Sequence, residues 1–454
     1  MAKKKRKPDK PAGKQSKGLS GNPRRRAEQI RARDEAGPAH GETRPTGTGA
    51  SGVGRHRTWP WWAASHATVL AQARDAEWPD RLLDIETLAG RLAGDEFHAR
   101  LSAPGSGAGM NPAGWFRTLT ETALDALSDD LAEDGKNWQR LWAFACGLAD
   151  EDGADEVAAA ASGFATLGVA PVPAVPVPWY QPAEGGDVLV ARDAYGDRFL
   201  LAAPFSDPGQ PGAVDHWYTW DVDWCGNDMV VAGGAYDSAA RALADWRDAV
   251  GAAAADAGFS PCPLELGIRL LGPVQPGSGQ AEAVAGDEPA EFFREWPRLS
   301  RRASTLSASL SRRFRADRSS ALADERDAAI DEFLGQHTGH AWNAPGDRGA
   351  AEDALDLILE FWGPILPADE RAFFACSPHR IETSAVIMRD SYEPDAVNEA
   401  LRLLPDWVRW CARHIGLGEE FAERAVAAAQ SEAATPASGP RGVRRREAPF
   451  RRPE

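Results

Sequence analysis

Lysine is almost absent from most of this chain. Seven of its eight lysines lie within residues 1–33, and Lys136 is the only one beyond them. Residues 1–33 contain 13 lysines and arginines against two acidic residues, a net charge of +11, whereas the whole chain carries −16. The remaining 421 residues therefore carry −27, and their cations are almost all arginines. Charge is thus segregated into a cationic segment and an acidic body.

Cysteines and uninterrupted apolar runs are also scarce. The five cysteines include no Cys-x-x-Cys pair, which argues against a disulfide framework and fits a reducing compartment. The long uncharged run at 157–179 contains four prolines, which remove helical hydrogen-bond donors, so it does not predict a transmembrane helix. No apolar segment typical of a secretory signal follows the basic start. We expect a cytoplasmic protein with no membrane partner.

Linear catalytic motifs are missing as well. The sequence contains no glycine-rich phosphate loop, no dinucleotide fingerprint, no G-x-S-x-G elbow and no set of kinase motifs. These absences favour a protein that is not an enzyme. A catalytic triad assembled only by folding would leave no linear signature and stays compatible with the sequence.

The pattern of apolar residues, prolines and glycines divides the chain into segments. Spacings of three and four predict helices, short apolar runs between turn residues predict strands, and polar Gly/Pro-rich stretches predict linkers. The predicted segments are a disordered basic arm (1–57), a helical domain (58–167), a Pro-rich connector (168–186), an α+β module (187–272), a linker (273–289), a C-terminal helical domain (290–434) and a disordered basic tail (435–454). The expected fold is multidomain and mainly α-helical, with a small central antiparallel β-meander plus helix.

Several helix ends can be predicted from single residues. Asn111 and Pro112 form a cap and first-turn pair, and Asp237 or Ser238 caps a helix that follows the meander. Near the end of the chain, Pro405 is expected at a helix start and Gly416 at the end of that helix.

The segment DHWYTWDVDW is predicted to be a strand of the meander. Alternation places Tyr218, Trp220 and Val222 on one face, which we expect to be covered by the helix that follows Ser238. Asp221 and Asp223 lie on the other face, where a metal site is a weak alternative.

Three stretches of the chain resemble those of a group of large bacterial proteins. They are ARDAYGDRFLLAAPF with the following DHWYTWDVDW and DSAARALADWRDAVG, the closing LLPDWVRWCARHIGL, and GNPRRRAEQIR of the arm. In these stretches the chain resembles large uncharacterised proteins of actinobacteria, which fits its Ala-, Arg- and Gly-rich, Lys-poor composition. The group has no assigned activity, so the resemblance implies no function.

Basic residues provide the candidate nucleic-acid contacts, because cations that neutralise phosphates release counterions. Two clusters carry them, the arm and the basic stretch 298–318. Leu299, Leu306, Leu310 and Phe314 recur there at helical spacing, which predicts a solvent-facing position for its arginines, including Arg301 and Arg302. The candidate residues are Lys3, Lys4, Lys5, Arg6, Lys7, Lys10, Arg24, Arg25, Arg26, Arg312, Arg313 and Arg315.

Two Cys-x-x-His pairs provide a candidate zinc site. They are Cys376 with His379 and Cys411 with His414, and four such ligands could close a tetrahedral site. Pro378 interrupts the first pair, and the apolar neighbours of Cys411 suit a buried thiol equally well. No other cofactor is expected.

Three functions are compatible with these patterns. The first is a binding or scaffolding protein whose basic arm contacts nucleic acid or an acidic partner. The second is a zinc-stabilised module or metal-dependent enzyme that uses the Cys/His pairs. The third is a protein-interaction scaffold with no nucleic-acid ligand, in which the 17 tryptophans serve cores and interfaces.

Overall fold

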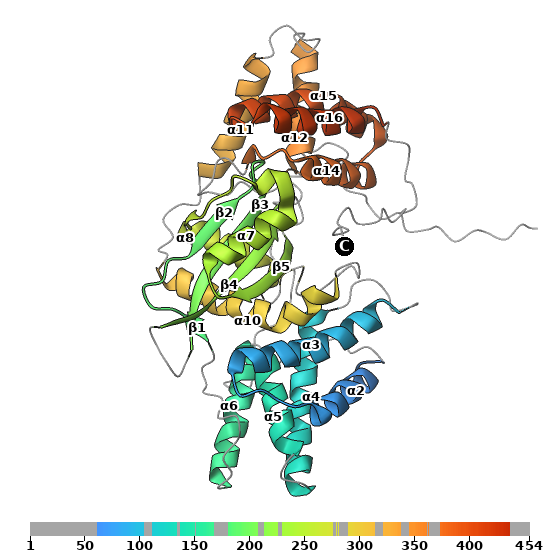
Figure 1. The fold of residues 1–454 in the computed structure, drawn as a ribbon. Helices are drawn as coiled ribbons and strands as arrows, with labels where there is room; N and C mark the ends of the chain where they lie inside the picture. The colour runs from blue at the N-terminus through green and yellow to red at the C-terminus, as the bar shows by residue number, and fades with distance from the viewer. Residues whose placement is uncertain are drawn as a thin grey trace, which may run out of the picture.

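The chain is mainly α-helical with one central antiparallel sheet, as predicted (Figure 1). The predicted basic arm, the basic tail and the Pro-rich stretch 168–179 lie outside the described residues. The computed structural model describes residues 61–103, 111–133, 137–149, 151–167, 180–207, 213–225, 229–275, 278, 280, 289–313, 321–336, 345–360, 362 and 373–435.

The predicted helical region at 58–167 contains five helices. They are α2 (Trp62–Asp75), α3 (Leu82–Leu101), α4 (Pro112–Glu133), α5 (Asn137–Leu148) and α6 (Glu151–Thr166). The start of α4 is as predicted, because Pro112 is its first residue and the backbone N–H of Gly114 donates to Asn111 Oδ1. These helices lie together at one end of the molecule (Figure 1).

The sheet is built around the predicted meander. Its strands are β1 (Gln181–Pro182), β2 (Leu189–Arg192), β3 (Arg198–Ser206), β4 (Val214–Asp223), β5 (Met229–Tyr236) and β6 (Ser260–Pro261). The order is β5-β4-β3-β2-β6, and β1 pairs with β3 beyond the end of β2. The two-residue strands β1 and β6 were not predicted, since so short a pairing has no periodicity to read.

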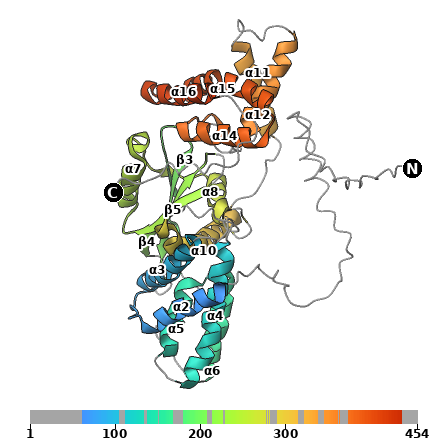
Figure 2. The ribbon, with the colours of Figure 1, turned by 90° about the vertical axis from the view of Figure 1, so that its right-hand side faces the viewer.

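Two helices cover opposite faces of the sheet (Figure 2). The predicted cover, α7 (Ala239–Val250), begins after Ser238, whose side chain accepts from the N–H of Arg241. It packs on the face that carries Asp221, and the indole of its Trp246 donates to that carboxylate at 3.0 Å. The expected position of α7 over the aromatic row is therefore wrong. The row faces α10 (Ala290–Arg313), where the indole of Trp220 donates to the carbonyl of Leu299 at 3.2 Å.

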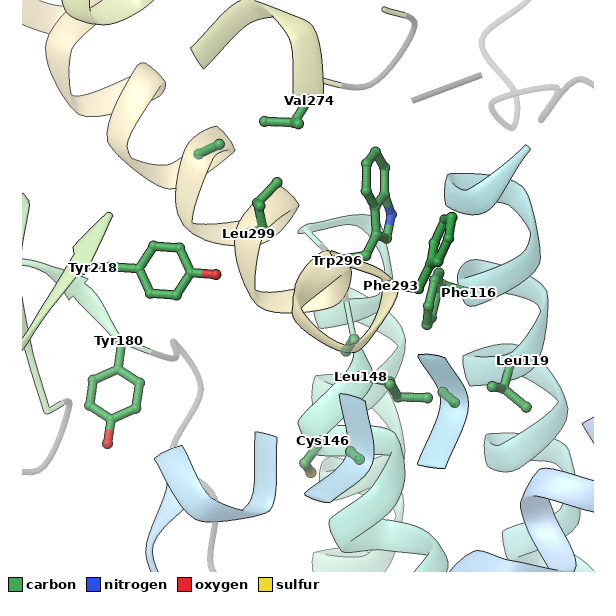
Figure 3. Close-up of a cluster of buried hydrophobic side chains, with 14 of the residues drawn as sticks. Phe116, Leu119, Cys146, Leu148, Tyr180, Tyr218, Val274, Phe293, Trp296 and Leu299 are labelled. Carbon is green, nitrogen blue, oxygen red and sulfur yellow. The ribbon is translucent and has the colours of Figure 1, made fainter. Parts of the chain in front are cut away.

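Helix α10 joins the sheet to helices α2 to α6. Its side chains Phe293 and Trp296 point toward α4 and α5, whereas Leu299 lies near Tyr218 of the sheet (Figure 3). Next to it, α8 (Leu264–Leu271) packs on α10 through its own apolar face. One continuous hydrophobic core therefore extends from α2 across α10 to the sheet.

The remaining helices form a second core. They are α11 (Ala321–Gln336), α12 (Pro345–Glu360), α14 (Pro378–Ser391), α15 (Pro394–His414) and α16 (Glu419–Ala433). The boundary between the two hydrophobic cores thus lies between α10 and α11, inside the predicted segment 290–434. The predicted domain boundaries themselves stay a prediction.

The predicted start of α15 at Pro405 is wrong. The helix begins 11 residues earlier, with Pro394 as its first residue, and continues through Pro405 to His414. Burial of Leu401, Leu404 and Trp407 on one face favours this continuous helix over the hydrogen bond that Pro405 cannot make. The end is as predicted, because Gly416 adopts a φ of 65° directly after the helix.

The described part of the chain contains no helix whose length and apolar content would let it span a lipid bilayer.

Candidate functional site

The predicted phosphate-binding cations fall into three groups. Those of the arm, together with Arg315, lie outside the described residues. Arg312 and Arg313 end α10, and both side chains are exposed, as predicted. Arg301 and Arg302 were expected on the solvent side, and this expectation is wrong, because they are only 5% and 1% exposed.

Arg301 and Arg302 are buried because α10 is covered on two sides. Toward α3, their guanidinium groups share the carboxylate of Glu86, which is itself fully buried. Arg302 Nη2 lies 2.7 Å from Glu86 Oε2, and Arg301 also donates to the carbonyl of Ala149. Buried charges of this kind are stable only when they are paired and hydrogen-bonded.

The pairing continues from Arg302 into the sheet. Arg302 Nε donates to His216 Nε2 at 3.3 Å, and His216 Nδ1 lies 3.0 Å from the carboxylate of Asp215. This geometry fixes the tautomer, since Nε2 must accept and Nδ1 must carry the proton. At the surface, Arg81 donates a hydrogen bond of 3.0 Å to Asp215. We call Glu86, Arg301, Arg302, His216 and Asp215 the buried arginine network.

Burial and charge set the protonation states of this network. Burial would raise the pKa of Glu86, but the guanidinium groups of Arg302 and Arg301 outweigh it and lower that pKa. Burial and then the charge of Arg302 lower the pKa of His216 to about 4, although Asp215 acts in the opposite direction. The network therefore holds a charged Glu86 beside a neutral His216 at neutral pH. It is a stabilising element that joins α3, α10 and β4, and it exposes no cation to a partner.

The four predicted zinc ligands do not come together. Cys376 and Cys411 are fully buried in the second core, and His414 lies against the rings of Phe374 and Trp410. Among the described residues, no three of the predicted four bring their ligand atoms within 4.8 Å of one another. Burial raises the pKa of Cys376 to about 12, as expected for an inert core thiol.

The fourth residue, His379, instead faces Asp223, the last residue of β4, and Cys225, two residues beyond it. Its Nε2 lies 3.3 Å from Asp223 Oδ2, and the ligand atoms of His379, Asp223 and Cys225 all lie within 4.8 Å of one another. No other such group of three or more potential metal ligands occurs in the described part of the chain. We call these three residues the junction cluster, because they lie where the end of β4 meets the first turn of α14.

Local structure explains the position of each member. Asp223 ends β4, and the chain then turns, so that the N–H of Cys225 donates to Asp223 Oδ1 at 2.9 Å. Ser377 caps α14 by accepting from the N–H of Arg380, which places His379 in the first turn. The Cys225 thiol lies 3.6 Å from the Ser377 hydroxyl.

The environment of the junction cluster is acidic. Burial would raise the pKa of Asp223, but the hydrogen bond and charge of His379, together with the hydrogen bonds of Cys225, outweigh it and lower that pKa. The hydrogen bond to Asp223 raises the pKa of His379. Burial, and then the charges of Asp197 and Asp223, raise the pKa of Cys225 far above its ordinary value. Nearby, burial and the charge of Asp197 raise the pKa of Asp193 to about 8, despite three backbone N–H donors.

Only part of the junction cluster was visible in the sequence. His379 was a candidate ligand, and Asp223 was considered only with Asp221, which instead binds Arg198 through both carboxylate oxygens. Cys225 was missed, although a cysteine two residues after an aspartate at a strand end is a usable signal. Chemically, a thiol, an imidazole and a carboxylate around one point can bind a transition metal or form a plain ion pair beside a buried thiol.

Comparison with known proteins adds no further assignment. No protein-family model, no curated protein and no solved structure matches this chain. The resemblance of its segments to actinobacterial proteins stays an expectation.

Proposed function

We propose that this chain is a binding or scaffolding protein that attaches to an anionic macromolecule, foremost nucleic acid, through its cationic segment 1–33. The observation that carries the proposal is the segregation of charge, with +11 in 33 residues and −27 in the rest of the chain. Such a segment neutralises phosphates and releases their condensed counterions into solution, which favours binding at low salt. The acidic body would repel the same phosphates, so binding would concentrate on the basic segment.

The exposed end of α10 is the part of the described body that fits the same role. Arg312 and Arg313 lie side by side in sequence with exposed side chains, and no ion pair joins either to another described residue. Arg301 and Arg302 are excluded from this role, because both are buried and paired with Glu86 in the interior. Two cations add a minor contribution beside the 13 of residues 1–33.

A salt series tests the proposal. The full chain, a deletion of residues 1–33 and the double variant Arg312→Ala/Arg313→Ala are titrated with duplex and single-stranded oligonucleotides. On duplex DNA, log K should fall with log salt with a slope of about −0.9 per phosphate neutralised. The deletion should lose most of this slope, and the double variant should reduce it by at most about 2.

The control is Arg402→Ala, which removes an exposed arginine of α15 that pairs with Glu399 on the same helix. It should leave both affinity and slope unchanged. If the full chain does not bind either oligonucleotide at low salt, an acidic protein partner or a scaffold without a nucleic-acid ligand replaces the proposal.

A further inference from the structure

The three ligand atoms of the junction cluster have the spacing of one metal site. Ligands at about 2.1 Å from a tetrahedral zinc ion lie about 3.4 Å apart, and a thiolate at about 2.3 Å lies slightly farther from its neighbours. His379 Nε2 and Asp223 Oδ2 are 3.3 Å apart, and Cys225 Sγ lies within 4.8 Å of both. A single ion therefore fits between the three atoms with small side-chain shifts.

The groups behind these ligands hold them in position. The second oxygen of Asp223 accepts the N–H of Cys225, which turns the first oxygen toward His379. The hydroxyl of Ser377 lies beside the Cys225 sulfur, where it can donate to a thiolate. Such outer hydrogen bonds orient the ligands of metal sites.

Arg380 fixes the two segments that carry the ligands. It is fully buried and donates to the carbonyl of Trp224 at 2.7 Å and to that of Ala375 at 3.1 Å. Trp224 precedes Cys225, and Ala375 precedes the cap of α14, so one side chain ties both backbones together. Arg380 thus holds the two ligand-bearing segments together, which reduces the entropy cost of binding.

The charge at this end of the sheet favours a cation. Asp197 and Asp223 lie there, and the buried guanidinium of Arg380 lies 3.8 Å from Asp197. Asp193 adds no charge at neutral pH, because its pKa is raised to about 8. A zinc ion with one carboxylate, one thiolate and one neutral imidazole forms a neutral set, so it adds no net charge to the interior.

We propose that Asp223, Cys225 and His379 bind one zinc ion, which fastens the end of β4 to the first turn of α14. The ion would connect the sheet, which belongs to the first hydrophobic core, to a helix of the second core. Three protein ligands leave a fourth position, and the His379 side chain is 33% exposed, so that position faces water or a small ligand. The site differs from the predicted four-ligand set, with which it shares only His379.

Cobalt binding to the full chain tests this proposal. The protein is stripped with a chelator, dialysed and titrated with Co²⁺, whose thiolate charge-transfer and d–d absorption bands report a cysteine ligand and tetrahedral geometry. We expect one Co²⁺ per chain, displaced by one Zn²⁺, and a higher melting temperature when metal is bound. The variants Cys225→Ser and His379→Gln should each weaken binding more than about 100-fold, because loss of an outer partner alone costs 10–100-fold.

The matched controls are Cys262→Ser and His414→Gln, which change a half-buried cysteine and an exposed histidine outside the junction cluster. Both should keep one Co²⁺ per chain. Because Cys225 is buried, its variant could fail to fold. The decisive variant is therefore His379→Gln, whose folding is checked by circular dichroism. The proposal is overturned if the wild type shows no thiolate–cobalt band at one equivalent, if folded His379→Gln binds as the wild type does, or if His414→Gln loses the metal.

Discussion

At the scale of single residues, the largest loss in the free energy of unfolding is expected when the buried carboxylate of Glu86 is replaced by an amide. The variant Glu86→Gln removes the shared counter-charge of Arg301 and Arg302, while both guanidinium groups stay buried. Breaking a buried pair in this way costs about 3–5 kcal/mol, because an uncompensated charge remains in the interior. Urea denaturation at pH 7 measures the loss in the free energy of unfolding.

The control for Glu86→Gln lies ten residues along the same helix. Glu96→Gln removes a carboxylate that pairs with the 40%-exposed Arg100. Surface pairs of this type contribute about 0–1 kcal/mol. Equal losses in the two variants would contradict a stabilising role for the buried arginine network.

Single residues also show where sequence reasoning stops. Arginine at 301 and 302 was interpreted as solvent-facing, because nothing near 298–318 identifies Glu86, which lies 215 residues earlier, as the partner. His379 was predicted to bind zinc together with Cys376, a pairing that followed from sequence proximity, whereas folding brings it to Asp223. Side chains satisfied by distant partners cannot be paired from periodicity alone.

At the scale of elements, helices and the hairpin of β2 and β3 could be predicted, because their signals are local. Apolar spacing identified the helices at 58–167. Ser238 identified the start of α7, and Gly416 identified the end of α15. What covers each face of the sheet could not be predicted. Helix α10 was expected to belong with the later helices, yet its Trp296 and Leu299 belong to the first core.

The contact between α3 and α10 depends on two glycines. A Cβ at Gly94 would lie 2.5 Å from the backbone nitrogen of Arg294, and one at Gly90 only 2.2 Å from its carbonyl oxygen. These are backbone atoms, so the two helices would have to separate. We expect Gly94→Ala to lower the free energy of unfolding by about 1–3 kcal/mol, as overpacking does elsewhere.

Gly163→Ala in α6 is the matched control, since a Cβ there would meet no atom within 4 Å. It should be neutral or stabilise by up to about 1 kcal/mol through helix propensity. Thermal unfolding of both variants distinguishes them. A stabilising Gly94→Ala would mean that α3 and α10 do not approach as closely as the structure shows.

At the scale of the whole molecule, buried titratable groups determine how stability depends on pH. Burial lowers the pKa of His66 to about 4, and burial with the charge of Arg302 lowers that of His216 to about 4. His66 lies against the rings of Trp62 and Trp115, whereas His216 faces Arg302, Glu86 and Asp215. Between pH 6.5 and 4 the unfolded chain therefore binds more protons at these histidines, and stability falls as the pH falls.

Asp193 acts in the opposite direction, since its pKa in the folded chain is raised from 3.8 to about 8. Its contribution is present below its unfolded pKa and is lost as the pH rises toward 8. Between pH 4 and 6.5, unfolding takes up about two protons at His66 and His216 and releases about one from Asp193, a net uptake of about one proton. The free energy of unfolding therefore falls by about 1.4 kcal/mol for each pH unit of acidification. Above pH 6.5 only Asp193 of these three titrates, so the stability maximum should lie near pH 6.5.

Asp193→Asn separates these contributions. An asparagine oxygen can still accept the N–H groups of Gly196 and Asp197, but it no longer loses a proton as the pH rises. In urea denaturation from pH 4 to 8 with excess chelator, the variant should keep the acid loss, with a steeper slope, and lose most of the decline above pH 6.5. Asp248→Asn, at an exposed position of α7, should leave the curve unchanged. An unaltered decline in Asp193→Asn would mean that the carboxyl is already ionised in the folded chain, and that another group carries the alkaline dependence.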